Sequence, residues 1–394
     1  MNNNEMTTDM PTTLSPRPYR ILQLIPTLQS GGAEKSCIDV AAAITQAGHK
    51  AFVATEGGVW ANEVIRGGGT VITLPLKSKN PITIWRNINR LAKVIKEYEI
   101  DLVHARSRAP AWSGYFAAKK AGIPFMTTFH AVYKFSGSLK KRYNSVMARG
   151  ARVIAISEYV AQHILDHYPT NPAHIRVIYR GTPIERFHPN MVHPERMIKL
   201  AKDWQLPEDK HLILMPSRLT RIKGHHVLLE ALTKLKRKDF VCIICGATPE
   251  RSRYQQELLE LIHKLNLQEV VRIVPILNDV PAGMRLAQVM VAPSLVPEGF
   301  GRMPVEAQAA GTPVVASAIG GHNEIILHGE TGWLVQPDDT DAMADAINTA
   351  LDMTEIERAT MATKAMSFVA QHFGREQMTD QTLRVYDELL KDRV

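Results

Sequence analysis

The chain has 394 residues, of which 45% are hydrophobic and 22% charged, as in ordinary globular proteins and unlike disordered or fibrous ones. This length exceeds the usual size of a single hydrophobic core and predicts two domains. The formal net charge of +8 favours an anionic partner: a phosphorylated substrate, a membrane surface or a nucleic acid.

The sequence shows no membrane-spanning segment, because no apolar run approaches the roughly 18 residues that such a helix needs. Residues 1–18 are rich in Asn, Thr and Pro and predict a disordered tail. The three cysteines fit a reducing compartment. Cys242 and Cys245 spell C-x-x-C, but a buried strand over 240–245 would direct them to opposite faces, so both are assigned to the core. We expect a cytoplasmic protein.

From residue 19, short apolar runs alternate with helical patterns, beginning with a strand over 20–25 and a helix over 33–47. Further strands are predicted at 51–55, 71–74, 102–105, 124–128, 153–156 and 175–178. Repeated strand–helix units of this kind predict a parallel sheet.

The alternation breaks at 181–189 and restarts at 211, which places a domain boundary near 185–208. The second series of strands is predicted at 211–216, 240–245, 270–274, 289–292, 313–316 and 333–335. Helical patterns over 341–351, 355–371 and 375–390 close the chain. The fold class is therefore α/β, with two Rossmann-like domains facing an interdomain cleft, where such sheets bind ligands.

The segment Pro297 to Glu306 (PEGFGRMPVE) carries the strongest chemical signal. Its glycines allow a tight turn, and Pro304 suits the first turn of a helix, whose N-terminus is an anion site. A diphosphate would lie on the amides around Phe300 to Arg302, with Glu298 reaching a sugar and Glu306 accepting from ribose hydroxyls. A plain surface loop with an acidic helix start is the alternative, since the helix dipole favours acids there.

Three other segments follow predicted strand ends. Arg218 and Lys223 would neutralise a departing diphosphate, although most exposed Arg and Lys residues are simply solvated. Gly31 and Gly32 open the first helix, as a turn approaching a phosphate or an acceptor would, but they do not form G-x-G-x-x-G. His130 is placed to touch a sugar hydroxyl, an interpretation that depends on its position because a lone His is often structural.

These motifs carry a family resemblance, in the order Gly31-Gly32, His130, Arg218 with Lys223, Glu298-x7-Glu306, Gly320-Gly321-x-x-Glu324 and Gly329-x-x-Gly332. The set resembles the retaining GT-B glycosyltransferases of family 4, over about 20–390. The resemblance implies transfer of a hexose from a nucleotide-diphosphate sugar with retained configuration, without a metal or other cofactor. It implies no protein nucleophile, with the leaving phosphate helping to deprotonate the acceptor.

The resemblance also distributes roles along the chain. After the tail at 1–18, it implies an acceptor-binding domain at 19–195, a nucleotide-sugar-binding domain at 196–374, and a C-terminal helix at 375–394 that packs back on the N-terminal domain. The nucleobase of the donor would lie near 275–277. The implied catalytic residues are His130, Glu298, Arg218 and Lys223. The implied donor-binding residues are Gly31, Gly32, Arg218, Lys223, Glu298, Gly299, Phe300, Gly301, Arg302 and Glu306.

The prediction of an acceptor site depends on residues 133–144, where cations alternate with aromatics. This pattern favours an anionic glycan or glycolipid acceptor, or an anionic membrane surface, and equally fits a solvated helix with packing aromatics. The candidate cations are Arg106, Arg108, Lys134, Lys140, Lys141 and Arg142. Residues 128–163 resemble bacterial transferases of lipopolysaccharide core and surface glycans, which suggests GDP-mannose as donor and a place on the inner face of the cytoplasmic membrane.

Several alternatives stay open. A GT-B epimerase or sugar phosphorylase would use the same cleft, and a non-catalytic nucleotide-sugar-binding protein would keep the donor contacts. Asp339-Thr-Asp341 has the spelling of a metal-binding Asp-x-Asp, but it follows Pro337 and opens a helix, so capping explains it better. No nucleic-acid-binding module is evident.

Overall fold

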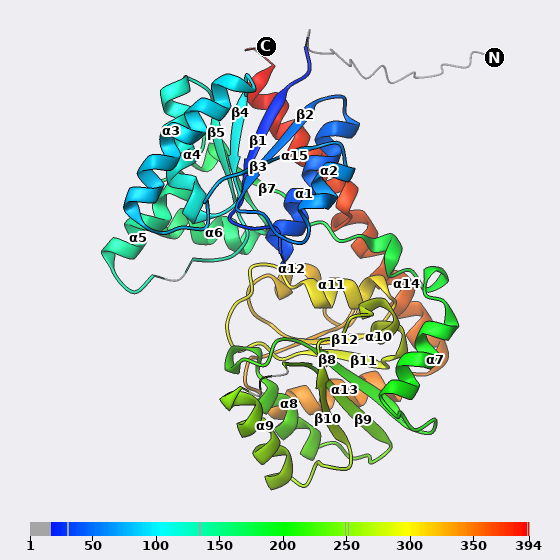
Figure 1. Ribbon diagram of the computed structural model, residues 1–394. Helices are drawn as coiled ribbons and strands as arrows, with labels where there is room; N and C mark the ends of the chain where they lie inside the picture. Colours follow the sequence, from blue (N-terminus) through cyan, green and yellow to red (C-terminus); the bar gives the residue numbers. More distant parts are fainter. Residues whose placement is uncertain are drawn as a thin grey trace, which may run out of the picture. The chain divides into compact units, whose positions relative to one another are not determined.

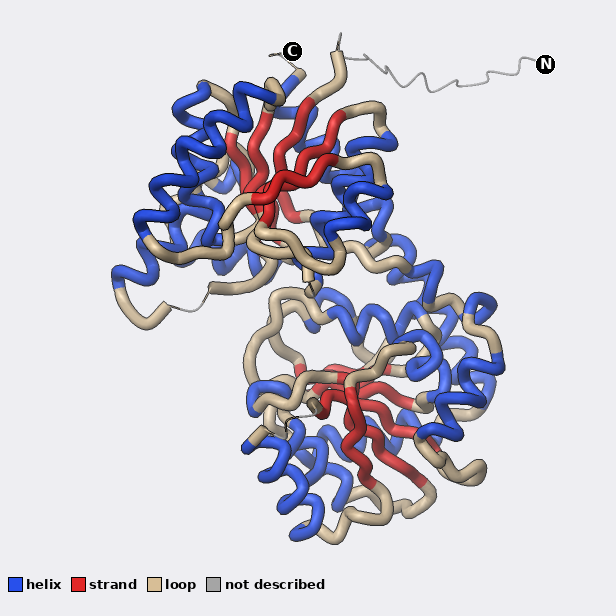
Figure 2. The backbone as a smooth tube through the Cα atoms, in the orientation of Figure 1, coloured by secondary structure: helices blue, strands red, loops and turns tan. Residues whose placement is uncertain are grey.

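The computed structural model describes residues 17–29, 31–133, 135–248, 250, 252–391 and 393. The chain forms two β-sheets, shown in red in Figure 2, and helices cover the faces of each. Nearly all of the predicted tail, residues 1–16, lies outside the described residues. None of the described helices is both long enough and apolar enough to span a membrane.

The first sheet has seven strands in the order β3-β2-β1-β4-β5-β6-β7 (Figure 1). Its strands are β1 (Arg20–Leu24), β2 (Lys50–Thr55), β3 (Thr70–Thr73), β4 (Leu102–Ala105), β5 (Phe125–Phe129), β6 (Val153–Ala155) and β7 (Ile175–Val177). Its helices are α1 (Gly32–Gln46), α2 (Ala61–Arg66), α3 (Pro81–Glu97), α4 (Arg108–Ala121), α5 (Ser138–Asn144) and α6 (Glu158–His167). The strand order reverses between β1 and β4, which pair in parallel. In such sheets ligands bind at the carboxyl ends of strands next to this reversal.

The second sheet has six strands in the order β10-β9-β8-β11-β12-β13. Its strands are β8 (His211–Pro216), β9 (Phe240–Ala247), β10 (Val271–Pro275), β11 (Val289–Ala292), β12 (Val314–Ser317) and β13 (Trp333–Val335). The helices here are α7 (Pro194–Asp203), α8 (His225–Thr233), α9 (Arg253–Lys264), α10 (Val280–Leu286), α11 (Arg302–Ala309), α12 (His322–Ile325), α13 (Thr340–Asp352) and α14 (Glu355–His372). The last helix of the chain is α15 (Arg375–Leu390). The reversal lies between β8 and β11, which pair in parallel.

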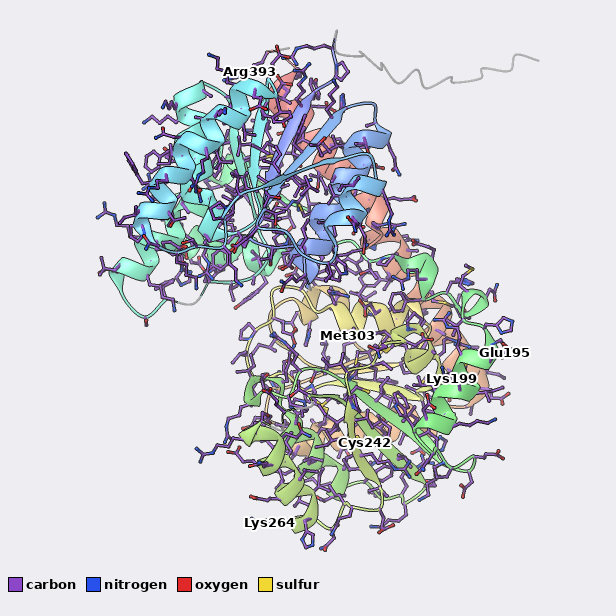
Figure 3. The ribbon with its side chains drawn as sticks, in the orientation of Figure 1. Glu195, Lys199, Cys242, Lys264, Met303 and Arg393 are labelled. Carbon is purple, nitrogen blue, oxygen red and sulfur yellow. The ribbon has the colours of Figure 1, made fainter. Side chains whose placement is uncertain are left out.

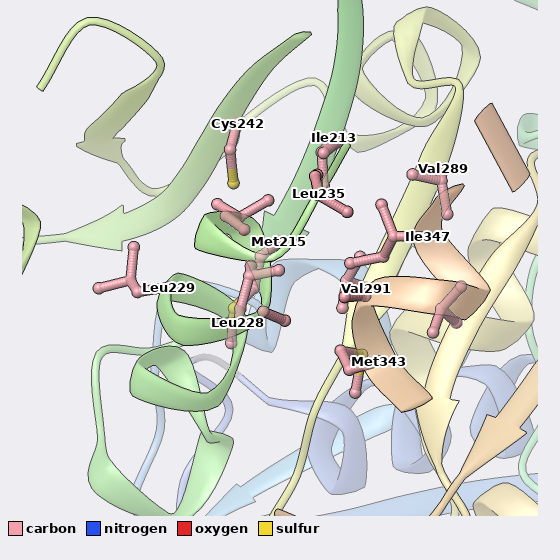
Figure 4. Packing of buried hydrophobic residues seen from close by; sticks show 14 of the residues in the cluster. Ile213, Met215, Leu228, Leu229, Leu235, Cys242, Val289, Val291, Met343 and Ile347 are labelled. Atoms are coloured by element: carbon pink, nitrogen blue, oxygen red, sulfur yellow. The ribbon is translucent and has the colours of Figure 1, made fainter. Parts of the chain in front are cut away.

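The core of the second sheet explains its long apolar runs. Met215 of β8, Leu228 of α8 and Met343 of α13 pack in one buried cluster (Figure 4). Parallel strands are buried on both faces, so they read as continuous hydrophobic segments. Cys242 and Cys245 on β9 are buried, which confirms their assignment to the core.

The chain divides into two compact units that do not follow simple sequence halves. The first unit consists of 1–128, 137–153 and 380–394, and the second consists of 129–136 and 154–379. Helix α15 therefore supplies residues to both units. The predicted fold class, two Rossmann-like α/β domains, is confirmed, and every strand lies within two residues of its predicted bounds.

Candidate functional site

A tight turn fixes the position of Lys223 in the second unit. Strand β8 ends at Pro216 and leads through exposed Arg218 to a single 3₁₀ turn, η5 (Arg221–Lys223). Gly224 closes the turn with a φ of 71° and begins α8. A Cβ on Gly224 would lie 1.8 Å from the carbonyl oxygen of Pro293, so only glycine lets this turn approach the loop that follows β11.

Glu298 lies in that loop after β11 and is held by several partners. The Nζ of Lys223 donates to its Oε1 at 2.7 Å, and the Ser294 hydroxyl donates to the same oxygen. The Nε2 of His322 lies 3.7 Å from this Oε1. Burial acts to raise the pKa of Glu298, but the charge of Lys223 and the hydrogen bonds from Lys223 and Ser294 oppose burial, and the pKa lies below its ordinary value. The carboxylate is therefore charged at neutral pH.

The N-terminus of α11 follows directly. Gly301 is its N-cap residue with a φ of 107°, and no side chain caps the helix. The first amides of a helix have no partner within the helix, so they can receive an anion. Gly321 N donates to Glu298 O at 2.9 Å, which fastens this loop to the segment before α12. Met303, labelled in Figure 3, marks the first turn of α11.

Glu306 lies further along α11 in a different environment. Its side chain is buried, and Arg302 donates to its Oε1 through two nitrogens at 2.8 and 3.2 Å. Burial raises the pKa of Glu306, although Arg302, Arg180 and Arg186 partly oppose the shift. Arg180 and Arg186 were not among the predicted site residues, although they are two cations around the break at 181–189.

His130 follows the end of β5, in a segment that belongs to the second unit. A Cβ on Gly299 would lie 3.2 Å from the Cα of Ala131, the residue after His130. The Ser157 hydroxyl donates to the carbonyl oxygen of Gly299 at 2.6 Å. The segment that carries His130 therefore lies against the loop of Glu298, and its contact with the sugar stays a prediction.

Gly31 and Gly32 lie in the first unit at the start of α1. Gly31 is the N-cap residue with a φ of 133°, and a Cβ there would lie 2.6 Å from the Oε2 of Glu34. A carboxylate thus lies at the helix start where the sequence suggested an approaching phosphate.

One predicted surface cation is not on the surface. Arg106 is only 3% exposed, and its guanidinium donates to Gln23 Oε1 at 2.5 Å and to Ser36 Oγ at 3.2 Å. It also lies near Tyr386 of α15, whose pKa it acts to lower. The expectation of an exposed cation at Arg106 is therefore wrong, because neutral partners from three distant segments enclose the side chain.

The remaining candidate cations lie around α5. The Nη1 of Arg108, at the start of α4, donates to Asn144 at 3.0 Å. Exposed cations on α5 are Lys140, Lys141 and Arg142, whereas Lys134 lies outside the described residues. The neighbouring aromatics pack internally: the ring of Phe135 lies 5.4 Å from that of His167. The structure thus separates packing aromatics from exposed cations in this segment.

Comparisons with known proteins identify the family of the chain. Residues 30–186 match the profile of Glycosyltransferase Family 4, and residues 197–367 match that of Glycosyl transferases group 1. A solved glycosyltransferase from Rickettsia africae ESF-5 is 37% identical, with a TM-score of 0.88 over 95% of this chain and 99% of that protein. The chain belongs to this glycosyltransferase family. Its two Rossmann-like domains are those of the GT-B architecture.

Two further proteins are similar to this chain over most of its length. HepE of Anabaena, solved in complex with UDP and glucose, is 25% identical over 94% of this chain and 100% of its own, with a TM-score of 0.82. D-inositol 3-phosphate glycosyltransferase of Salinispora tropica is 28% identical over 315 residues, which are 74% of this chain. That match spans 64% of the relative, slightly less than two thirds of its length.

Proposed function

We propose that this glycosyltransferase moves a hexose from a nucleotide-diphosphate sugar to an anionic glycan or glycolipid acceptor. The observation that carries the proposal is the contact of Lys223 with Glu298 in the loop that leads into the uncapped start of α11. A cation and free helix amides suit a diphosphate, and a charged carboxylate suits sugar hydroxyls. The three features lie at the strand-order reversal between β8 and β11, where ligands of such sheets bind.

The proposed donor contacts follow from these environments. Lys223 and Arg218 would neutralise the diphosphate, the amides around Phe300 to Arg302 would bind its oxygens, and Glu298 would accept from the sugar. Glu306, buried beside Arg302, would accept from the ribose hydroxyls. His130 would approach the sugar from the segment against Gly299.

The proposed reaction retains the anomeric configuration. The bond between the anomeric carbon and the diphosphate oxygen breaks, and a bond from that carbon to the acceptor oxygen forms on the same face. The proton of the acceptor hydroxyl passes to the departing phosphate oxygen, so no protein nucleophile and no cofactor takes part. Lys223 and the helix amides stabilise the negative charge that develops on the diphosphate, as donors aimed at a developing charge do in other enzymes.

The direct test is the acceptor-dependent release of nucleoside diphosphate from a nucleotide sugar. Lys223→Ala and Glu298→Ala should strongly reduce the release, whereas Lys199→Ala, on an exposed cation of α7 labelled in Figure 3, should leave it unchanged. If the protein converts the donor into its epimer when no acceptor is present, the result would favour an epimerase. If the reaction requires inorganic phosphate, the result would favour a phosphorylase. Wild-type protein that binds a nucleotide sugar but turns over none with any acceptor would favour a binding protein.

The donor itself can be found by thermal shift, because a ligand that binds the native state raises its apparent stability. UDP-glucose is the first probe, since HepE binds UDP and glucose. GDP-mannose is the second, because it follows from the likeness to surface-glycan transferases. ADP-sugars complete the set, and a shift with one nucleotide alone identifies the base.

We also propose that the enzyme works on the inner face of the cytoplasmic membrane, in lipopolysaccharide core or other surface-glycan synthesis. In the first unit, Ile82 and Trp85 of α3 are 61% and 65% exposed, and Leu139 of α5 is 82% exposed. Helix α3 packs on α4, and the 3₁₀ helix η1 (Ser145–Ala148) contacts both α4 and α5. Exposed cations on α3 and α5 accompany these apolar side chains, as in segments that bind anionic lipid.

The membrane proposal is tested by co-sedimentation with vesicles. The protein should bind vesicles that contain phosphatidylglycerol and should not bind vesicles of phosphatidylcholine alone. Equal binding to both vesicle types, or to neither, would remove the electrostatic argument for the membrane.

A further inference from the structure

His322 is a fully buried imidazole beside the loop that carries Glu298. Its Nδ1 lies 3.0 Å from the carbonyl oxygen of Ser317, and because a carbonyl only accepts, this nitrogen carries a hydrogen. Its Nε2 has no hydrogen-bond partner among the described residues and lies 3.7 Å from Glu298 Oε1. One ring nitrogen is thus satisfied and the other faces the carboxylate that we assign to the sugar.

The ring is also packed against the start of α11, where we propose that the diphosphate binds. A Cβ on Gly301, the N-cap residue of α11, would lie 2.7 Å from Cδ2 and 3.1 Å from Nε2 of His322. The same imidazole therefore touches the start of α11 and faces Glu298. It connects the part of the site proposed for the diphosphate with the part proposed for the sugar.

Two titratable groups act on the ring: Glu298 from the loop before α11, and Lys223 from η5. Burial lowers the pKa of His322, and the opposing effect of Glu298 does not restore it, so the ring is neutral in the ligand-free protein. A neutral ring leaves a bare Nε2 lone pair facing a carboxylate, which is an unfavourable arrangement for a buried acceptor. A proton on Nε2 would convert this contact into a charged hydrogen bond.

Donor binding changes the balance of charge at Glu298. Lys223 is its cationic partner in the structure and is also the cation that the diphosphate would attract. The diphosphate adds negative charge and would also pair with Lys223. The negative charge of Glu298 is then less fully neutralised by Lys223. Both effects favour a proton on the imidazole.

We propose that His322 is a positioning residue for Glu298, which takes up a proton when the donor binds and holds the carboxylate toward the sugar through Nε2–H. The inference rests on the proposed function, because it presupposes a nucleotide-sugar donor. His322 itself touches no reacting atom and acts through Glu298.

Two variants separate this role from simple packing. His322→Asn keeps an amide N–H for the Ser317 carbonyl and places nothing against Glu298. His322→Gln can direct an amide N–H toward Glu298 but cannot titrate. Thermal unfolding of both variants, compared with wild type, shows whether they fold.

The measurement compares binding of a nucleotide sugar with binding of the nucleoside diphosphate alone. The Asn variant should lose about tenfold in affinity for the nucleotide sugar, as expected for one charge-assisted hydrogen bond, and keep its affinity for the nucleoside diphosphate. The Gln variant should retain most of the sugar-dependent affinity. Equal losses in both variants, or equal losses for both ligands, would overturn the inference.

Calorimetry in buffers of different ionisation enthalpy measures the proton itself. The wild type should take up a proton when it binds the nucleotide sugar, and its affinity should rise as the pH falls from 8 to 6. The Gln variant should show neither effect, while Glu306 and the other acids stay the same in both proteins. Binding without proton uptake overturns the inference and leaves the proposed function intact, whereas wild-type protein that binds no nucleotide sugar overturns both.

Discussion

Gly224 and Gly329 provide a matched test of the turn that positions Lys223. Both have a left-handed backbone, with φ of 71° and 76°. A Cβ on Gly329 would meet nothing within 4 Å, whereas a Cβ on Gly224 would lie 1.8 Å from the carbonyl oxygen of Pro293 and 2.9 Å from its carbonyl carbon. The two alanine variants therefore share the conformational cost and differ in the steric one.

The expected magnitudes follow from this difference. Gly329→Ala should cost only the left-handed conformation of an L residue, about 1–2 kcal/mol. Gly224→Ala should cost an additional 1–3 kcal/mol or so, because backbone movement alone can relieve the overlap with Pro293. The extra cost should lower the melting temperature of the second unit by several degrees more, since roughly 2–4 °C accompanies each kcal/mol in a domain of 150–250 residues.

Differential scanning calorimetry of the two variants measures this comparison, and donor turnover adds a functional readout. Gly224→Ala should also lower kcat/KM for the donor, because the displaced turn carries Lys223, whereas Gly329→Ala should not. Equal melting temperatures for the two variants would refute the argument that the close approach to Pro293 fixes the turn.

Three further variants have expected outcomes. Lys223→Ala should reduce turnover by about 10²–10³-fold. The same change should destabilise the protein more at pH 7 than at pH 4. The pKa of Glu298 is lower in the folded state than in the unfolded state, so the ion pair with Lys223 stabilises the fold fully at pH values above the unfolded-state pKa. This stabilisation is lost as the pH falls through the folded-state pKa. Equal destabilisation at both pH values would contradict this. Glu306→Gln should melt at the same or a higher temperature than the wild type at pH 7. Burial raises the pKa of Glu306, so its protonated form stabilises the fold at low pH and this contribution is lost as the pH rises. The variant should bind the nucleotide more weakly, and an unchanged affinity in isothermal titration would mean that Glu306 has no ligand role. Trp85→Ala should weaken sedimentation with anionic vesicles and leave turnover of a soluble acceptor unchanged, so a loss of both would point to misfolding.

The strands could be predicted closely because a strand buried on both faces appears as an uninterrupted apolar run. Strand β8 reads HLILMP and β11 reads VMVA, and both were predicted with their observed bounds. The composition of the two compact units was not predictable in this way. Segment 129–136 and the two parts of α15 belong to one unit or the other because of packing between residues far apart in the chain. The periodicity of the sequence carries no information about such packing.

The contact between Lys223 and Glu298 shows what strand order adds to sequence. The residues are 75 positions apart, but each follows the carboxyl end of a strand, and the two strands are neighbours in the sheet. Arg106 also follows a strand end, and the same reasoning placed it wrongly on the surface. Its burial depends on Gln23 and Tyr386, partners that only the three-dimensional structure brings together.

The opposite pKa shifts of Glu298 and Glu306 indicate how the site balances charge. In the structure, Lys223 offsets Glu298 and Arg302 offsets Glu306, so these four side chains are neutral as a group. A diphosphate adds two negative charges, which the amides of α11, exposed Arg218 and the proposed proton on His322 can compensate. Glu298, with three polar neighbours, keeps its charge while Lys223 turns to the donor. The proposed site would bind the nucleotide and the sugar through separate groups, so variants at Glu306 and at His322 should affect the two affinities independently.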